Sequence, residues 1–211
     1  MGASGPMPQR YSIGRMLRII AGELRSRPLA TPTGRDRTRP MGSRTREAVF
    51  NVLRGWFEDA AVLDLFAGVG TLGLEAVSRG ASRVWLVEQD REVHDLLRRN
   101  VESMGVADRV QLVRADALGE VALATIDRPL DVVFMDPPFE LVRTAEGLDR
   151  VLAQAARCRE RMKPRSFLVL RLPEIEGDGP VIPGFVGPEH RRYGAEQHVL
   201  LYCPQAPEQA A

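Results

Sequence analysis

Three glycines and one aspartate form the first group of residues whose types and spacing suit a chemical function. Gly68, Gly70 and Gly73 follow G-x-G-x-x-G spacing, and Asp64 lies four residues before the first of them. Between a strand and a helix, such glycines let the backbone approach a nucleotide-like ligand, and the helix start offers unpaired N–H groups. Dinucleotide enzymes use the same spacing. The carboxylate of Asp64 would repel two phosphates and attract an ammonium or a sulfonium, so the group favours a cationic ligand.

Two further acids follow apolar stretches that are typical of buried strands. Glu88 lies eighteen residues after Gly70 at the end of one stretch, and Asp116 follows the next. A carboxylate at Glu88 could accept both hydroxyls of a ribose, and Asp116 could accept from an adenine amino group. Ligands of parallel sheets bind at the carboxyl ends of the strands, so the repetition of acids there favours a single site.

The segment Asp136-Pro-Pro-Phe139 is the most specific of the candidate sites. The two prolines hold the backbone stiff and bring no N–H of their own. Asp136 and the carbonyl of Pro137 could therefore both accept from one exocyclic amine, while Phe139 offers a flat face for a base. Two acceptors would turn the amine nitrogen towards tetrahedral geometry and aim its lone pair. Asp136 then orients the amine and need not be a strong base, because the proton can leave to water.

Alternating strands and helices must position these groups. The expected strands are 62–66, 84–88, 110–113, 130–135 and 166–172, followed by an antiparallel hairpin of 190–193 and 197–202. The expected helices are 72–78, 90–104, 118–125 and 144–162, with Pro164 separating the last of them from its strand. This alternation predicts an α/β fold with a doubly wound, mostly parallel sheet.

Charge divides the chain unevenly. Residues 1–54 hold eleven arginines and three acids, a balance of +8, whereas the whole chain carries +1, so the remainder carries −7. A basic arm on a mildly acidic body indicates a surface that contacts nucleic-acid phosphates.

The elements of this basic arm can be outlined. Residues 17–21 and 24–29 predict a small hairpin. Ser43 is expected to cap a helix that ends near Gly55, with its arginines on the polar side. The Pro- and Gly-containing loop between them carries three more arginines. The arginines of the loop and the helix are Arg35, Arg37, Arg39, Arg44 and Arg46.

Composition sets the expected boundaries. Residues 1–15, rich in Gly, Pro and Ser, are expected to form a disordered extension, and 204–211 a disordered tail. Residues 16–55 are expected to form the basic RNA-contacting hairpin and helix, and 56–203 the catalytic α/β domain.

Several function classes are disfavoured. No apolar run is long enough to span a bilayer and no signal peptide is recognisable, so we expect a cytoplasmic protein without a membrane partner. Cys158 and Cys203 form no disulfide or metal pattern. His94, His190 and His198 lack ligand spacing, so we expect no metal.

Taken together, these residues resemble a known group of enzymes. Asp64-Leu-Phe-Ala-Gly-Val-Gly70 with Asp136-Pro-Pro-Phe139 resembles the class I S-adenosylmethionine (SAM)-dependent methyltransferases that modify exocyclic amines of nucleobases. Further segments resemble the RsmD family, the bacterial 16S rRNA guanine-N2 methyltransferases, over residues 16–202. These segments are Arg18-Ile-Ile-Ala-Gly22, Arg39-Pro40, Arg44-Thr-Arg-Glu-Ala-Val-Phe-Asn51, Gly73-Leu-Glu-Ala-Val-Ser-Arg-Gly-Ala81 and Arg192-Tyr-Gly194.

The resemblance implies a seven-stranded class I fold, SAM as methyl donor, and a guanine N2 of 16S rRNA in the small ribosomal subunit as acceptor. We expect the protein to act as a monomer. The catalytic residues would be Asp136, Pro137 and Phe139. The cofactor-binding residues would be Asp64, Phe66, Gly68, Gly70, Glu88 and Asp116. The RNA-binding residues would be Arg18, Arg35, Arg37, Arg39, Arg44 and Arg46.

The chain also departs from the family, and two other functions stay open. Met41 and Ser43 stand where the family usually has Thr and Asp, which bears on contacts to RNA. One alternative is another RNA or DNA amino-methyltransferase, because these enzymes share the Asp-Pro-Pro-Phe segment. The other is a nicotinamide-dependent oxidoreductase that uses the three glycines, in which Asp64 and Asp136 would have no role.

Overall fold

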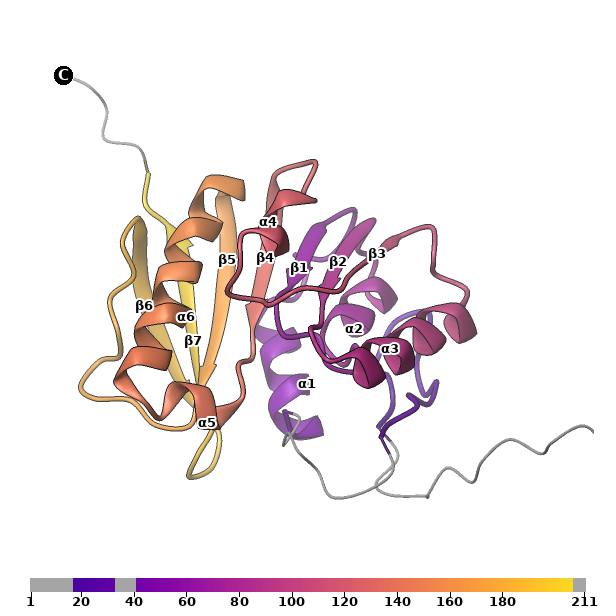
Figure 1. The fold of residues 1–211 in the computed structure, drawn as a ribbon, viewed down its shortest axis with the longest axis horizontal. Coiled ribbons are helices and arrows are strands. Elements are labelled where there is room, and N and C mark those ends of the chain that lie inside the picture. Colours follow the sequence, from indigo (N-terminus) through magenta and orange to yellow (C-terminus); the bar gives the residue numbers. More distant parts are fainter. Residues whose placement is uncertain (1–16, 33–40, 207–211) are drawn as a thin grey trace, which may run out of the picture.

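A seven-stranded sheet forms the centre of the protein (Figure 1), as seen in a computed structural model that describes residues 17–32 and 41–206. The strand order is β3-β2-β1-β4-β5-β7-β6. Strands β1 to β5 are parallel, and β7 lies antiparallel between β5 and β6. The strands are β1 Ala61–Asp64, β2 Arg83–Val87, β3 Val110–Val113, β4 Leu130–Met135, β5 Met162–Leu172, β6 Phe185–Arg192 and β7 His198–Pro204. The predicted doubly wound, mostly parallel sheet is confirmed.

Helices cover both faces of this sheet because alternate strand residues point to opposite faces. In β1, Val62 belongs to one buried cluster and Leu63 to the other. The first cluster includes residues of α1 Ser43–Val52, α2 Gly73–Ser78 and α3 Arg91–Met104. The second includes residues of α4 Val121–Ala124, α5 Phe139–Val142 and α6 Ala145–Cys158, which precedes the short 3-10 helix Arg159–Arg161.

The strand order reverses between β1 and β4, and in open α/β sheets ligands bind at the carboxyl ends of the strands beside such a reversal. The chain leaves β1 towards β2 and β3 on one side, then returns to β4 on the other side of β1. Asp64, the last residue of β1, pairs in register with Phe134 of β4. Asp136 follows directly after β4. The acids that end β1 and β4 therefore lie at the position where open α/β sheets bind ligands.

The sequence predicted a hairpin of two strands at the N-terminal end of the described chain, and the prediction of strands is wrong. Residues 17–29 form one isolated antiparallel bridge, between Arg18 and Pro28, around a turn. The backbone N–H groups of Ile20 and Ala21 donate to the Glu75 carboxylate of α2, and that of Leu24 donates to Ser78 Oγ. Two backbone hydrogen bonds flank the bridge, from Ile19 N–H to the carbonyl of Arg27 at 3.0 Å and from Leu29 N–H to that of Leu17 at 2.8 Å. The donors nearer the turn bond to α2 rather than across the hairpin, so the pairing does not extend beyond one bridge.

Helix α1 differs from the prediction in its cap and in one face. Gly42 is the N-cap residue, and Ser43 is the first helical residue and makes no capping hydrogen bond. Arg46 was predicted on the polar side, but it is 1 % exposed. Its Nη2 donates to the carbonyl of Arg18 at 2.6 Å, so the side chain ties α1 to the N-terminal segment.

Several boundaries also differ. β5 begins at Met162 and includes Pro164, where the pairing with β4 shifts register between Leu130 and Val132. α4 is only four residues long, and α5, which was not predicted, begins at Phe139. β6 begins at Phe185 rather than residue 190 because its first residues pair with the end of β7.

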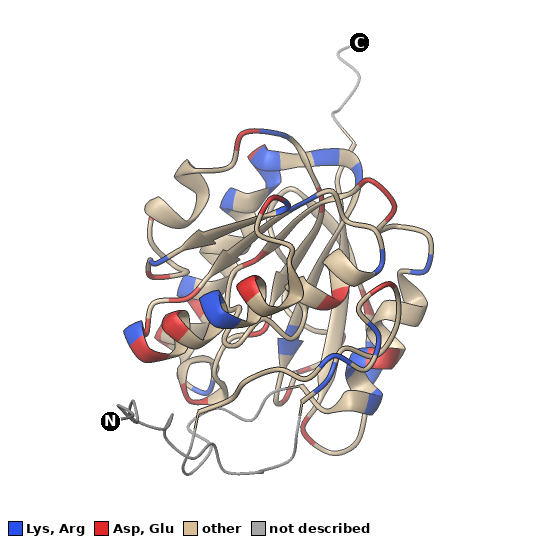
Figure 2. Cartoon of the chain, turned by 90° about the vertical axis from the view of Figure 1, so that its right-hand side faces the viewer, with Lys and Arg blue, Asp and Glu red and all other residues tan. Residues whose placement is uncertain are grey.

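Part of the predicted disordered tail is ordered, and other predictions cannot be compared with the structure. β7 runs to Pro204, and Gln205 N–H donates to the carbonyl of Gly184 at 2.8 Å. The predicted extension 1–15, the end of the tail at 207–211 and the loop arginines lie outside the described residues. On the side of the molecule seen in Figure 2, basic and acidic residues are interspersed.

Candidate active site at the carboxyl ends of β1, β2 and β4

Asp64 lies beneath the glycine turn and is 1 % exposed. Its Oδ2 accepts from the N–H of Gly73 at 3.0 Å, which satisfies one of the unpaired donors at the start of α2. Its Oδ1 is buried and has no hydrogen-bond partner among the described residues. Burial raises the pKa of Asp64 from 3.8 to about 7, and the charges of Asp136 and Glu88 add to this shift. A cation near this turn would favour the ionised carboxylate.

The glycines of the turn serve two different purposes. Gly68 has a φ of +54°, and a Cβ added there would meet nothing within 4 Å, so its surroundings are open. Gly70 has a φ of +94°, and a Cβ there would lie 2.7 Å from side-chain atoms of Leu74 and Leu97. Gly70 is therefore needed for packing the turn against α2 and α3, whereas only Gly68 leaves space for a ligand to approach.

Glu88 closes the turn from the neighbouring strand. Its Oε2 accepts from the N–H of Gly68 at 3.1 Å, and its Oε1 accepts from the N–H of Asp90 at 2.8 Å. Burial raises the pKa of this carboxyl above its ordinary value. Glu88 therefore lies beside the open side of the glycine turn, where the sequence predicted a ribose contact.

Asp116 lies apart from this group on the surface. Its Oδ1 accepts from the N–H of Leu118 at 2.9 Å, and its Oδ2 lies 3.7 Å from Arg150 of α6. The side chain of Asp116 is about half exposed. Its predicted contact with an adenine amine stays a prediction.

Asp136 is paired with a residue that the sequence reading missed. The Nε of Arg171 donates to Asp136 Oδ1 in a short ion pair, and the two side chains are 5 % and 11 % exposed. Burial raises the pKa of Asp136 above the ordinary carboxyl value, and the charge and hydrogen bond of Arg171 oppose this rise. The available signal was a lone charge inside the apolar stretch Phe167-Leu-Val-Leu-Arg-Leu172.

Phe139 and Arg171 line a pocket at the end of the sheet. The guanidinium carbon of Arg171 lies 4.5 Å from the centroid of the Phe139 ring. Both residues border a pocket of about 260 Å³ whose other wall is the loop between β6 and β7, residues 193–197. Arg143, which follows α5, pairs with Glu196 of this loop at 3.2 Å. The pocket therefore combines an aromatic face, a carboxylate-bound guanidinium and a loop.

The predicted site residues fall into distinct groups. The carboxylates of Asp64, Glu88 and Asp136 lie close enough for the last two to act electrostatically on the first. Pro137 is buried directly after Asp136, and Phe66 is partly buried beside the glycine turn. The three strand ends thus bring the glycine turn and the carboxylates of Asp64, Glu88 and Asp136 to one edge of the sheet.

The predicted RNA-contacting arginines that the structure describes differ in their exposure. Arg18 and Arg44 are exposed, and Arg18 Nη1 donates to the carbonyl of Ser26 at 2.8 Å. The prediction for Arg46 is wrong, because a buried side chain cannot reach an RNA phosphate. The remaining predicted residues, Arg35, Arg37 and Arg39, lie outside the described residues.

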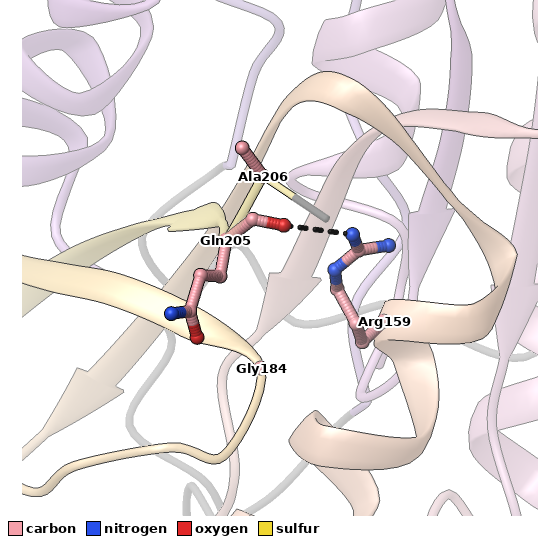
Figure 3. Close-up of a pocket in the computed structure, with 4 residues that line it drawn as sticks. All are labelled: Arg159, Gly184, Gln205 and Ala206. Atoms are coloured by element: carbon pink, nitrogen blue, oxygen red, sulfur yellow. Dashed lines mark hydrogen bonds between the residues drawn. The ribbon is translucent and has the colours of Figure 1, made fainter. Parts of the chain in front are cut away.

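A second pocket, of about 380 Å³, lies on another part of the surface (Figure 3). It is lined by Arg159, Gly184, Gln205 and Ala206, and Arg159 Nη2 donates to the carbonyl of Gln205 at 2.9 Å. None of the predicted site residues borders it, so it has no part in the candidate active site.

Two features of the described part of the chain bear on other functions. Within residues 17–32 and 41–206, no three His, Cys, Asp or Glu side chains are grouped so that they could hold a metal ion. Over the same residues, no helix has the length and apolar character needed to cross a membrane.

Comparison with known proteins identifies the family. The family model described as "Conserved hypothetical protein 95" matches residues 17–202. The ribosomal RNA small subunit methyltransferase D of Haemophilus influenzae is 33 % identical over 171 residues, which cover 79 % of this chain and 82 % of that protein. The protein of the same name from Escherichia coli K12 is 42 % identical over 129 residues, 61 % of this chain; the match spans 63 % of its length.

A solved structure shares the fold over nearly the whole chain. The Escherichia coli protein yhhF superimposes with a TM-score of 0.75 at 31 % identity, covering 91 % of this chain and 99 % of that chain. The sheet and its flanking helices have the arrangement of the class I SAM-dependent methyltransferases. The chain therefore belongs to the Conserved hypothetical protein 95 family, which is the RsmD family of methyltransferases.

Proposed function

We propose that this protein transfers a methyl group from SAM to the exocyclic N2 of a guanine in 16S rRNA of the small ribosomal subunit. One observation carries the proposal: Phe139 and Arg171, which is the ion-pair partner of Asp136, border a pocket at the carboxyl end of β4, one strand away from the glycine turn that follows β1. The names of the curated relatives, which are small-subunit rRNA methyltransferases, support the substrate.

The residues of the glycine turn fit SAM. Gly68 leaves open space beside the turn, Asp64 has an unsatisfied carboxylate oxygen below it, and Glu88 lies at the next strand end. We assign Asp64 to the cationic amino-acid end and Glu88 to the ribose hydroxyls, with Phe66 and Asp116 completing the site. When bound, SAM supplies an electrophilic methyl group on its sulfonium.

Asp136 and Pro137 orient the target amine. The lone pair of guanine N2 is delocalised into the ring, so the amine is a poor nucleophile. Asp136 and the Pro137 carbonyl accept its two hydrogens and direct the lone pair, and Phe139 stacks on the base. The target base leaves its own stack to enter, which costs a few kcal/mol. The proton released from the amine leaves to water, so a carboxylate held by Arg171 suffices.

The basic arm supplies the RNA surface. Arg18 and Arg44 are exposed, and the loop arginines Arg35, Arg37 and Arg39 continue the same basic segment. We propose that these residues contact rRNA phosphates and that the protein acts as a monomer in the cytoplasm, where small subunits are assembled.

The test is methylation of small-subunit particles from a strain that lacks the endogenous enzyme. The parent protein should produce N2-methylguanosine in the 16S rRNA. Asp136→Ala should lose on the order of a hundredfold or more in single-turnover rate while S-adenosylhomocysteine still binds. Asp149→Ala, which removes an exposed carboxylate from α6, is the matched control and should keep the parent rate. Methyl transfer by Asp136→Ala at the parent rate would refute this active site, and a methylated adenine or another RNA as product would refute the substrate.

A further inference from the structure

Arg171 contacts both groups that we assign to the target base. Its Nε donates to Oδ1 of Asp136, and its guanidinium lies over the ring of Phe139 at 4.5 Å. Asp136 follows β4, whereas Phe139 begins α5, so the two groups belong to different local structures. One buried side chain therefore connects the proposed amine acceptor to the proposed stacking surface.

The sheet register explains why Arg171 reaches this position. Met135 of β4 pairs with Leu170 of β5, so the next residues, Asp136 and Arg171, lie beside one another. On the other side of β5, Arg171 pairs in register with Val199 of β7. Two neighbouring strands therefore fix the position of Arg171, and its side chain is 5 % exposed. Burying an arginine is costly unless it is paired, so Asp136 and Arg171 depend on each other.

We propose that Arg171 is a positioning residue that holds Asp136 and Phe139 in one arrangement, so that the acceptor and the stacking surface for the base are set by a single guanidinium. This inference rests on the proposed function. Arg171 holds Asp136 through Oδ1, so the direction in which the carboxylate faces the target amine depends on the guanidinium. The planar guanidinium can donate at its edge to a carboxylate and stack on an aromatic ring with its face, which an ammonium cannot do.

The positive charge has a second consequence for Asp136. Burial favours the protonated carboxyl, and the charge and hydrogen bond of Arg171 lower the pKa against that effect. A protonated carboxyl donates rather than accepts at one oxygen, and this would compete with the amine hydrogen. Arg171 should therefore extend activity to lower pH as well as fix geometry.

Two substitutions separate charge from geometry. Arg171→Gln removes the charge, so its pKa effect on Asp136 is lost and the acidic limb of the rate profile should move to higher pH. Its transfer rate at neutral pH should fall about a hundredfold, as for a misplaced reacting group. Arg171→Lys keeps the positive charge but lacks the planar guanidinium. The acidic limb of its pH–rate profile should therefore stay in place, while its transfer rate should still fall. Arg161→Gln, which replaces an exposed arginine directly before the opposite end of β5, is the control and should change neither.

The measurement is single-turnover methylation of small-subunit particles across pH, at saturating SAM, with S-adenosylhomocysteine affinity measured in parallel. The cofactor affinity of both Arg171 variants should stay within about twofold of the parent, because Arg171 has no role at the glycine turn. An unmoved acidic limb in Arg171→Gln, or a parent-like rate in Arg171→Lys, would overturn the inference. If Arg171→Gln does not fold, the rate of Arg171→Lys decides. Absence of transfer by the parent protein would instead refute the proposed function.

Discussion

The affinity for the cofactor should depend on pH through Asp64. The pKa of this carboxyl is raised to about 7, chiefly by burial, and one of its oxygens has no partner among the described residues. We have assigned the positively charged end of SAM to this carboxylate, which attracts a cation only when it is ionised. Binding should therefore weaken as pH falls through about 7.

The size of the effect follows from the ionised fraction. With a pKa of about 7, roughly half of the Asp64 carboxyls are ionised at pH 7 and about one tenth at pH 6. If binding requires the ionised form, the Kd for S-adenosylhomocysteine, whose amino-acid end is retained, should rise about fivefold over this interval. Binding at pH 7 should also release about half a proton, because the bound cation favours the carboxylate.

Titration calorimetry in buffers of different ionisation enthalpy measures both quantities. Asp64→Asn keeps an oxygen that can accept from Gly73 N–H but cannot titrate, so its affinity should be weaker and nearly independent of pH over this interval. Glu88 also has a raised pKa, and this comparison isolates the contribution of Asp64. An affinity of the parent protein that does not change between pH 8 and 6, or an equal decrease in Asp64→Asn, would refute the assignment of the cation to Asp64.

The same carboxyl should affect stability in the opposite direction. The folded protein holds a proton on Asp64 that the unfolded chain releases at a lower pH, because the folded pKa is the higher one. The contribution of Asp64 to the free energy of unfolding should therefore be greatest at acidic pH and decrease as pH rises from about 4 to about 7. A bound cation should offset this decrease.

Three other predictions follow from single contacts. Glu75→Gln should lower the free energy of unfolding by about 2–4 kcal/mol in urea titrations. The fully buried carboxylate of Glu75 accepts from two backbone N–H groups and one arginine, and an amide cannot satisfy all three donors. A change below about 0.5 kcal/mol would contradict this reasoning. Phe139→Ala should lose about 1–3 kcal/mol of base stacking, which is about 5- to 150-fold in kcat/KM, and should retain slow transfer; complete inactivity would point to a different role for the ring. Replacing Arg35, Arg37 and Arg39 together with Ala should reduce the slope of log affinity for rRNA against log salt by about 2 and leave cofactor affinity unchanged, whereas an unchanged slope would remove this loop from the RNA surface.

The architecture and the positions of the glycine turn and the strand-end acids could be predicted from the sequence because they depend on local patterns. Alternating apolar runs and helical stripes determine which segments are strands and helices, and a parallel sheet follows from their order. Glycine spacing and acids at strand ends then locate the site at one edge of the sheet. The prediction for α3 was nearly complete because Asp90 caps it and Gly105 ends it, and both signals are local.

The predictions that failed concern partners from distant parts of the chain. Glu75 and Ser78 of α2 take the backbone donors of residues 20–24, so the expected hairpin keeps a single bridge. Arg46 has the spacing of an exposed helix residue, yet the N-terminal segment covers it and accepts its hydrogen bond. Neither contact leaves a local pattern in the sequence.

The same reason separates Asp136 from Arg171. Asp136 could be identified from its own neighbours, since an acid before two prolines and a phenylalanine is a local signal. Arg171 stands thirty-five positions later and becomes a neighbour only when β5 pairs with β4 in parallel register. The sequence by itself determined the fold class, the glycine turn and the segment Asp136-Pro-Pro-Phe139 that we propose to bind the amine. Only the tertiary structure decided which charges are buried together, because burial and ion pairing depend on strand register and on helix packing across the whole chain.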